Sequence, residues 1–169
     1  MWLLIVPFFW FASPSPLLLA VGIGLAALGL AIRASAAGFI HKDRELTTTG
    51  PYAFTRNPLY LGSFFLGLGI TIAGGHPLFV ALFVAFFAVV YTRTIRHETR
   101  QLQAVFGDGY SEYARHVPVF IPRLIPYRGT AAVPSAGFSG QRWKRNREYE
   151  ALLGAVAGFA VLALRMWLR

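Results

Sequence analysis

The setting of Arg56 suggests a binding role. This residue follows a Gly50-Pro51 turn and precedes Asn57 and Pro58, and proline is favoured in the first turn of a helix. Asn57 occupies the position of an N-cap, so backbone N–H groups and the positive end of the helix dipole would lie beside the Arg56 guanidinium. Such a site would receive a carboxylate or a phosphate. The alternative is a membrane-entry turn in which Arg56 extends toward the lipid surface.

Glu98 is a carboxylate on the apolar face of an otherwise basic segment. At 100° per residue, its helical face also carries four apolar or aromatic residues: Tyr91, Ile95, Leu102 and Val105. An unpaired carboxylate in such surroundings is costly, so Glu98 needs a partner. A cationic or hydroxyl-rich ligand would serve, and an ion pair with Arg33 or Arg56 is the structural alternative.

Two tyrosines follow a predicted helix end. Gly107 closes the helix that carries Glu98, and Asp108 can cap a short helix after it. Tyr110 and Tyr113 are three residues apart and therefore share a face. Their rings could stack on a base, or they could lie in an interfacial belt of the kind found in membrane proteins.

Other ligand-binding motifs are missing from the sequence. The chain has four histidines and no cysteine, and the histidines show no metal-ligand spacing, so we expect no metal site. A glycine-rich dinucleotide motif and a phosphate loop are also absent. The net charge of +9 fits nucleic-acid binding or the cytoplasmic Lys/Arg excess of a membrane protein. Because the apolar residues come in blocks, we favour the membrane and expect no nucleic-acid partner.

Apolar helices must position these residues. The chain is 56% hydrophobic and 14% charged, whereas about a quarter of the residues of a soluble domain are charged. Apolar blocks cover residues 2–12, 17–32, 59–73, 78–91 and 151–168. We therefore predict an all-α integral membrane helical bundle with about five apolar segments. The first block is too short to span alone, since a span takes roughly 20 residues.

Charges predict the orientation and the division of the chain. The stretches 33–56 and 93–147 hold most of the Lys and Arg residues, so we predict a cytoplasmic N-terminus and a cytoplasmic active site. We expect a core at 1–127, a basic cytoplasmic linker at 128–150, and an additional transmembrane or interfacial helix at 151–169.

Two blocks of sequence together resemble the isoprenylcysteine carboxyl methyltransferase and phospholipid methyltransferase superfamily. Segment 50–62, GPYAFTRNPLYLG, is similar to the superfamily's Arg-His/Asn-Pro-x-Tyr motif. Segment 98–118, ETRQLQAVFGDGYSEYARHVP, is similar to its Glu-Glu-x-x-Leu block. The resemblance covers about residues 17–123. Thr99 stands where the superfamily has a second glutamate, and Asn57 stands where it has histidine or, commonly in bacterial members, asparagine.

This resemblance implies methyl transfer from S-adenosylmethionine to a lipophilic acceptor (a carboxylate, an amine or a lipid head group) at the cytoplasmic membrane face. Arg56 would hold the methionyl carboxylate, Glu98 would hold the ammonium or ribose hydroxyls, and the C-terminal segment of the core would cover the cofactor. Arg33 would position the acceptor. The segment 110–123 should converge with Arg56 on one pocket. The cofactor-binding residues implied in this way are Tyr52, Arg56, Asn57, Pro58, Tyr60, Glu98, Tyr110 and Tyr113.

Two other functions remain open. A sterol-reductase-like enzyme, which would use NADPH, resembles this chain around Pro51-Tyr52, Arg56 and Val117-Pro118, although such proteins are usually longer. A non-enzymatic membrane scaffold or lipid-binding protein could use the basic stretch 141–147 on anionic lipid. A scaffold would not need Glu98 on an apolar face.

Overall fold

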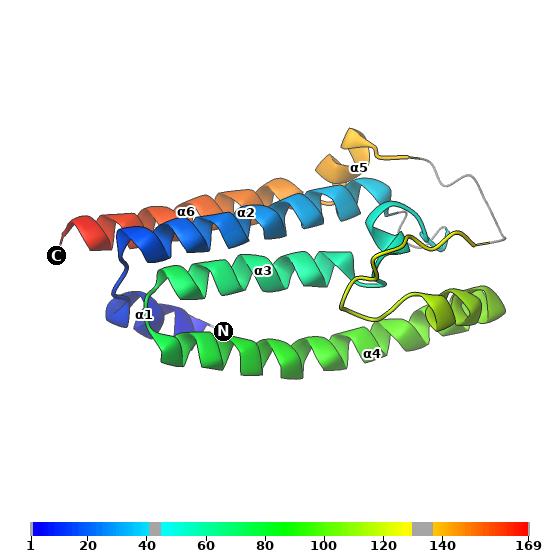
Figure 1. Cartoon of the computed structure of the whole chain (residues 1–169), viewed down its shortest axis with the longest axis horizontal. Coiled ribbons are helices and arrows are strands. Elements are labelled where there is room, and N and C mark those ends of the chain that lie inside the picture. The colour runs from blue at the N-terminus through cyan, green and yellow to red at the C-terminus, as the bar shows by residue number, and fades with distance from the viewer. Residues whose placement is uncertain (1, 41–44, 130–136, 169) are drawn as a thin grey trace.

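The computed structural model describes residues 2–40, 45–129 and 137–168, and these form an all-helical bundle, as predicted. Its elements are α1 (Trp2–Phe11), α2 (Pro16–Phe39), the 3-10 helix η1 (Gly50–Ala53), α3 (Pro58–Ala73), α4 (Pro77–His116), α5 (Gly140–Arg145) and α6 (Glu148–Trp167). Figure 1 shows α2, α3, α4 and α6 running side by side along the long axis. Residues 130–136 of the predicted linker lie outside the described residues.

Helices cover all five predicted apolar blocks, but they differ in length. By length and composition, α2, α4 and α6 could each cross a membrane, whereas α3 is a shorter apolar helix of 16 residues. Large apolar side chains on all three long helices are exposed, for example Ile23, Val89 and Leu153. Such a surface suits lipid and not water. The structure therefore fits an integral membrane protein.

The contact between α2 and α3 is built from glycines. A Cβ atom at Gly29 would lie 2.5 Å from the Gly62 carbonyl oxygen, and one at Gly22 would lie 2.4 Å from the Gly69 carbonyl oxygen. The same holds in reverse for Gly62 and Gly69. Any side chain at these positions would collide with the neighbouring backbone, so the two helices approach as closely as small residues permit. This contact fixes α3, which begins directly after Arg56.

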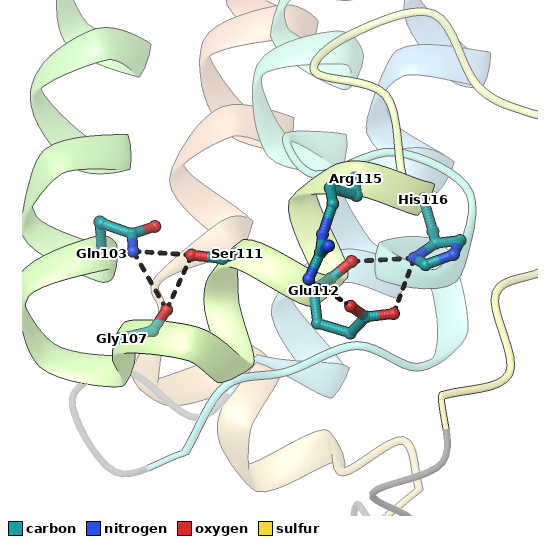
Figure 2. A network of polar contacts seen from close by, with 6 residues as sticks. All are labelled: Gln103, Gly107, Ser111, Glu112, Arg115 and His116. Atoms are coloured by element: carbon teal, nitrogen blue, oxygen red, sulfur yellow. Dashed lines mark hydrogen bonds and ion pairs between the residues drawn. The ribbon is translucent and has the colours of Figure 1, made fainter.

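Helix α4 is 40 residues long and kinks at Gly107, where the sequence predicted a helix end. Gly107 has φ 51° and ψ −122°, a conformation that favours glycine. Figure 2 shows the polar contacts around the kink: Gln103 Nε2 and Ser111 Oγ each donate to the Gly107 carbonyl oxygen at 3.2 Å. The chain thus turns back, which allows the segment after α4 to reach the rest of the bundle.

The segment 117–127, which we call the tail, returns from α4 to the start of α3 (Figure 1). The Arg56 N–H donates to the Pro118 carbonyl at 2.9 Å, the Arg123 N–H donates to the Phe54 carbonyl at 2.9 Å, and the Tyr127 N–H donates to the Ala53 carbonyl at 2.9 Å. Backbone bonds therefore hold the tail against residues 53–56.

The last helix, α6, packs against α2 and α3. Leu162 is completely buried there, and Glu148 at the start of α6 is 7% exposed. The predicted end of the core at residue 127 stays a prediction. In the structure, α6 is part of the packed helical bundle.

Candidate functional site

Arg56 lies where the tail, α3 and α4 meet. Its Nη1 donates to the Tyr110 hydroxyl at 3.2 Å, and its guanidinium carbon lies 5.9 Å from the centroid of the Tyr110 ring. The Tyr110 hydroxyl in turn donates to Thr99 Oγ1 at 3.3 Å. Arg56 Nε is buried and has no hydrogen-bond partner among the described residues. A buried N–H of a cation without an acceptor is costly, and an anionic ligand would satisfy it.

Glu98 has a partner that sequence reasoning did not find. The Tyr60 hydroxyl, from α3, donates to Glu98 Oε1, from α4. Tyr60 also packs edge-on against Tyr91 of α4, with ring centroids 4.9 Å apart. A phenol hydroxyl that donates to a carboxylate stabilises its charge. The structural alternative for Glu98, an ion pair with Arg33 or Arg56, is therefore not needed to explain a carboxylate on this apolar face.

Tyr52 and Tyr113 form a second tie between η1 and the end of α4. The Tyr113 hydroxyl donates to the Tyr52 carbonyl oxygen at 2.7 Å, and both side chains are 7% exposed or less. Burial raises the pKa of the Tyr52 hydroxyl, so this group is neutral at physiological pH. The Tyr52 hydroxyl oxygen is also buried without a hydrogen-bond partner among the described residues. It is a second polar atom that a ligand could satisfy.

These groups open onto a cavity of about 680 Å³, which we call the tyrosine cavity. Six of the eight predicted cofactor-binding residues line it: Tyr52, Arg56, Asn57, Glu98, Tyr110 and Tyr113. Its volume is within the range of small-molecule sites. The expected convergence of Arg56 with the segment 110–123 is thus what the structure has, since Tyr110 and Tyr113 share this cavity and Pro118 bonds to the Arg56 backbone.

The remaining predicted residues lie elsewhere. Pro58 is fully buried and lines no described cavity; it starts α3. Tyr60 reaches the site only through Glu98. Arg33 lines neither described cavity: its Nε and Nη2 each bond to Glu148 at 2.9 Å, and its Nη1 bonds to Ser63 Oγ at 2.5 Å.

Asn57 stands at the N-cap position of α3, as expected, but its side chain makes no capping bond. Its Nδ2 donates instead to the Val119 carbonyl at 2.8 Å. Thr55 Oγ1 similarly donates to the Phe120 carbonyl at 3.0 Å. Both side chains therefore secure the tail.

A larger cavity of about 1000 Å³ was not anticipated from the sequence. We call it the phenylalanine cavity because Phe64, Phe87 and Phe120 line it, and Phe120 lies 6.0 Å from each of the other two rings. Arg56 and Thr99 line both cavities, so together they form part of the wall between them. One sequence signal for this cavity was available: Phe87 and Tyr91 are four residues apart and so share a helix face, where their rings stack with centroids 3.9 Å apart.

No group of three or more His, Cys, Asp or Glu side chains that could hold a metal ion occurs in the described ranges. The metal-free reaction stays a prediction. The tyrosine cavity combines an unsatisfied guanidinium N–H, a carboxylate and several aromatic faces. These groups fit an amino-acid-like ligand that carries a ring system.

The part of this chain that contains Arg56 and Glu98 is similar to known proteins. The phospholipid methyltransferase family model matches residues 17–109, which contain Arg56, Glu98 and the whole of α3. A cobalt-zinc-cadmium resistance protein of Cupriavidus metallidurans is 38% identical over 117 residues, covering 68% of this chain and 54% of its own. No solved structure matches this chain.

Two relatives carry the name of a methyltransferase. The protein-S-isoprenylcysteine O-methyltransferase of Schizosaccharomyces pombe is 36% identical over 116 residues, covering 62% of this chain and 49% of its own. Methanethiol S-methyltransferase 2 of Bradyrhizobium diazoefficiens is 40% identical over 81 residues, covering 47% of this chain and 29% of its own. This chain therefore spans about half the length of such relatives, or less. The chain belongs to the phospholipid methyltransferase family, in the superfamily that includes the isoprenylcysteine carboxyl methyltransferases.

Proposed function

We propose that this protein transfers a methyl group from S-adenosylmethionine to a lipophilic acceptor at the cytoplasmic face of a bacterial inner membrane. One observation carries the proposal: the tyrosine cavity brings an unsatisfied Arg56 Nε and the Glu98 carboxylate into one small-molecule site. An amino-acid moiety has a carboxylate and an ammonium group, and these are the charges that such a pair would complement.

The chain's own residues have separate tasks in this reaction. S-adenosylmethionine, when bound, would supply an electrophilic methyl group: a nucleophilic atom of the acceptor would bond to the methyl carbon as the carbon–sulfur bond breaks, and the cofactor would depart as a neutral thioether. Arg56 would hold the methionyl carboxylate, and Glu98, oriented by Tyr60, would accept from the ammonium or the ribose hydroxyls. The rings of Tyr110 and Tyr113 would flank the adenine or the sulfonium. Catalysis then depends on positioning and electrostatics, with no need for a covalent intermediate.

The phenylalanine cavity is the proposed acceptor site. It shares Arg56 and Thr99 with the tyrosine cavity, so an acceptor there would lie next to the bound cofactor. Its walls carry four aromatic rings for an apolar body, those of Phe64, Phe87, Tyr91 and Phe120. The described residues that line it include four arginines and no carboxylate: Arg56, Arg93, Arg96 and Arg100. This lining favours a carboxylate or another anionic head group over an amine. The relatives named for isoprenylcysteine and for methanethiol indicate that acceptors vary within the superfamily.

The tail is the proposed cover. It lies over Arg56 through its backbone bond at Pro118, and Val119 and Phe120 line the acceptor cavity. A cover of this kind would exclude water from the reacting groups. Arg33, bonded to Glu148 and Ser63, would act on the acceptor only if it left that pair.

Binding and transfer experiments test the proposal. The purified protein in nanodiscs should bind S-adenosylmethionine in a calorimetric titration, with and without EDTA, and should not bind NADPH. Tritium from labelled cofactor should then appear in a total lipid extract of the source organism. Binding of NADPH alone would favour the sterol-reductase-like alternative. Binding of neither cofactor would favour a lipid-binding or scaffold protein.

A further inference from the structure

The tail carries large apolar side chains that the bundle does not cover. Ile121 is 78% exposed, Leu124 is 96% exposed and Ile125 is 71% exposed. The other side of the tail is fixed by backbone bonds from Arg56, Arg123 and Tyr127. Its conformation is therefore held, and these three side chains point away from the residues that hold it. Exposure of three large apolar side chains to water is unfavourable, and such a group marks a surface that another apolar partner covers.

The tail also lies at the depth where lipid begins. The Phe120 ring packs against Phe64, six residues into α3, and against Phe87, six residues before the first charged residue of α4, Arg93. At 1.5 Å per residue, this places Phe120 about 9 Å inside the ends of both apolar stretches. Interfacial segments bury their apolar side chains about 5–10 Å into the boundary between head groups and acyl chains. Ile121 directly follows Phe120 in the chain, so the exposed apolar group of the tail begins close to the ends of both apolar stretches.

The sequence on both sides of the tail is basic, as suits an anionic lipid surface. The sequence has no acidic residue between Glu112 and Glu148, and seven basic residues occur in that interval: Arg115, Arg123, Arg128, Arg142, Lys144, Arg145 and Arg147. Arg123 lies between Ile121 and Leu124, and its Nη1 donates to the His116 carbonyl at 2.8 Å, which holds the cation beside the apolar group. Basic residues near a membrane surface are attracted to anionic head groups.

We propose that the tail is an interfacial membrane anchor, in which Ile121, Leu124 and Ile125 insert into the leaflet while Arg123 and Arg128 contact lipid phosphates. The occupant of this surface is lipid, and the anchoring holds whether or not the protein transfers methyl groups. Anchoring would also affect the site, because the same tail bonds to the Arg56 backbone and contributes Phe120 to the phenylalanine cavity.

The chain has no cysteine, so single labels can be placed without removing any residue first. Leu124→Cys and Ile121→Cys would each be labelled with an environment-sensitive fluorophore in the full chain, reconstituted in nanodiscs that contain anionic lipid. Asp108→Cys is the control, since Asp108 is exposed on α4 beyond the Gly107 kink. Nitroxide groups attached to lipid near the head group should quench labels 121 and 124 several-fold more than label 108. Aqueous iodide should do the reverse.

Two outcomes would overturn the proposal. If iodide quenches labels 121 and 124 as strongly as label 108, with no quenching by lipid nitroxide, the tail faces water. If the labels are protected from iodide without lipid quenching, and dilution of the protein in detergent removes the protection, a second copy of the chain covers the surface. Because no step depends on cofactor or acceptor, this experiment can succeed while the transfer assay fails, and the reverse is equally distinguishable.

Discussion

The two sides of α3 pack in opposite ways. Toward α2, glycines bring the backbones into contact, with only 2.4–2.6 Å available for a Cβ atom at the crossing points. Toward α4, phenylalanine rings and the Tyr60–Glu98 bond hold the helices apart around a cavity of about 1000 Å³. The difference indicates that α2 and α3 form a rigid base, and that ligands are accommodated on the other side of α3.

The largest effect on stability is expected where α3 packs closely against α2. Gly29→Leu should destabilise the bundle by more than about 3 kcal/mol, because even its Cβ atom would collide with the Gly62 carbonyl and overpacking against backbone cannot relax. Thermal unfolding in detergent would measure the change. Gly24→Leu is the control on the same helix, since a Cβ atom there meets nothing within 4 Å. Equal loss in both variants would show that α2 and α3 do not depend on their close contact.

Glu98, which joins α4 to α3 through Tyr60, should contribute to ligand binding. Glu98→Gln removes a charge-assisted contact and should weaken S-adenosylmethionine binding by roughly 1.5–3 kcal/mol. Glu112→Gln is the matched control, because Glu112 bonds to Arg115 on the exposed surface of α4, with 2.7 Å between the atoms. A calorimetric titration compares them. If both variants bind alike, Glu98 has no part in the cofactor site.

A change in the phenylalanine cavity should separate acceptor from cofactor. Phe120→Ala removes an aromatic wall, and lost apolar contact in a pocket is worth roughly 1–3 kcal/mol, or about tenfold or more in transfer. Binding of S-adenosylmethionine should stay within about twofold, since Phe120 does not line the tyrosine cavity. Phe79→Ala, at the opposite end of α4, controls for general loss of aromatic packing. Weakened cofactor binding in Phe120→Ala alone would mean that the two cavities act as one.

The smallest effect concerns the attachment of the tail to the open side. Asn57→Ala removes the bond to the Val119 carbonyl and should cost about 1 kcal/mol of stability. Binding of S-adenosylmethionine should also weaken slightly, because the tail secures Arg56. Asn146→Ala removes a comparable bond, to the Ala37 carbonyl at 2.9 Å, and neither Asn146 nor Ala37 lines the tyrosine cavity. It should lower the melting temperature equally and leave binding unchanged; a binding loss in both would separate Asn57 from the site.

The helices and much of the tyrosine cavity could be predicted from the sequence. Apolar blocks mark the helices because lipid demands them, and Gly107 marks the kink because its φ is positive. Arg56 and Tyr110 could be brought together because a tight turn joins α3 to α4. The bond from Asn57 to Val119 and the partner of Glu98 could not, since neither periodicity nor composition fixes which side chains meet across 38 or 62 residues.

The phenylalanine cavity shows a second limit. Its rings come from α3, α4 and the tail, and each ring alone is an ordinary apolar residue of a membrane helix or loop. A cavity is a failure of side chains to fill the space between helices, and such a gap depends on the crossing of α3 and α4. The unpartnered Arg56 Nε is similarly a property of the surroundings, and no local pattern in the sequence carries it.

The pairing of Arg33 with Glu148 has a consequence for the way the protein is made. A ribosome synthesises Arg33 at the end of α2 long before Glu148, which follows 115 residues later at the start of α6. During that interval Ser63 is made and can become a neighbour of the guanidinium, but the Glu148 carboxylate does not yet exist, so the guanidinium is free of this partner and can extend to the membrane surface. The ion pair closes only when α6 enters beside α2 and α3, and it is therefore a marker of completed membrane insertion. Bundles halted during translation before residue 148 should retain an Arg33 that is open to water-soluble reagents.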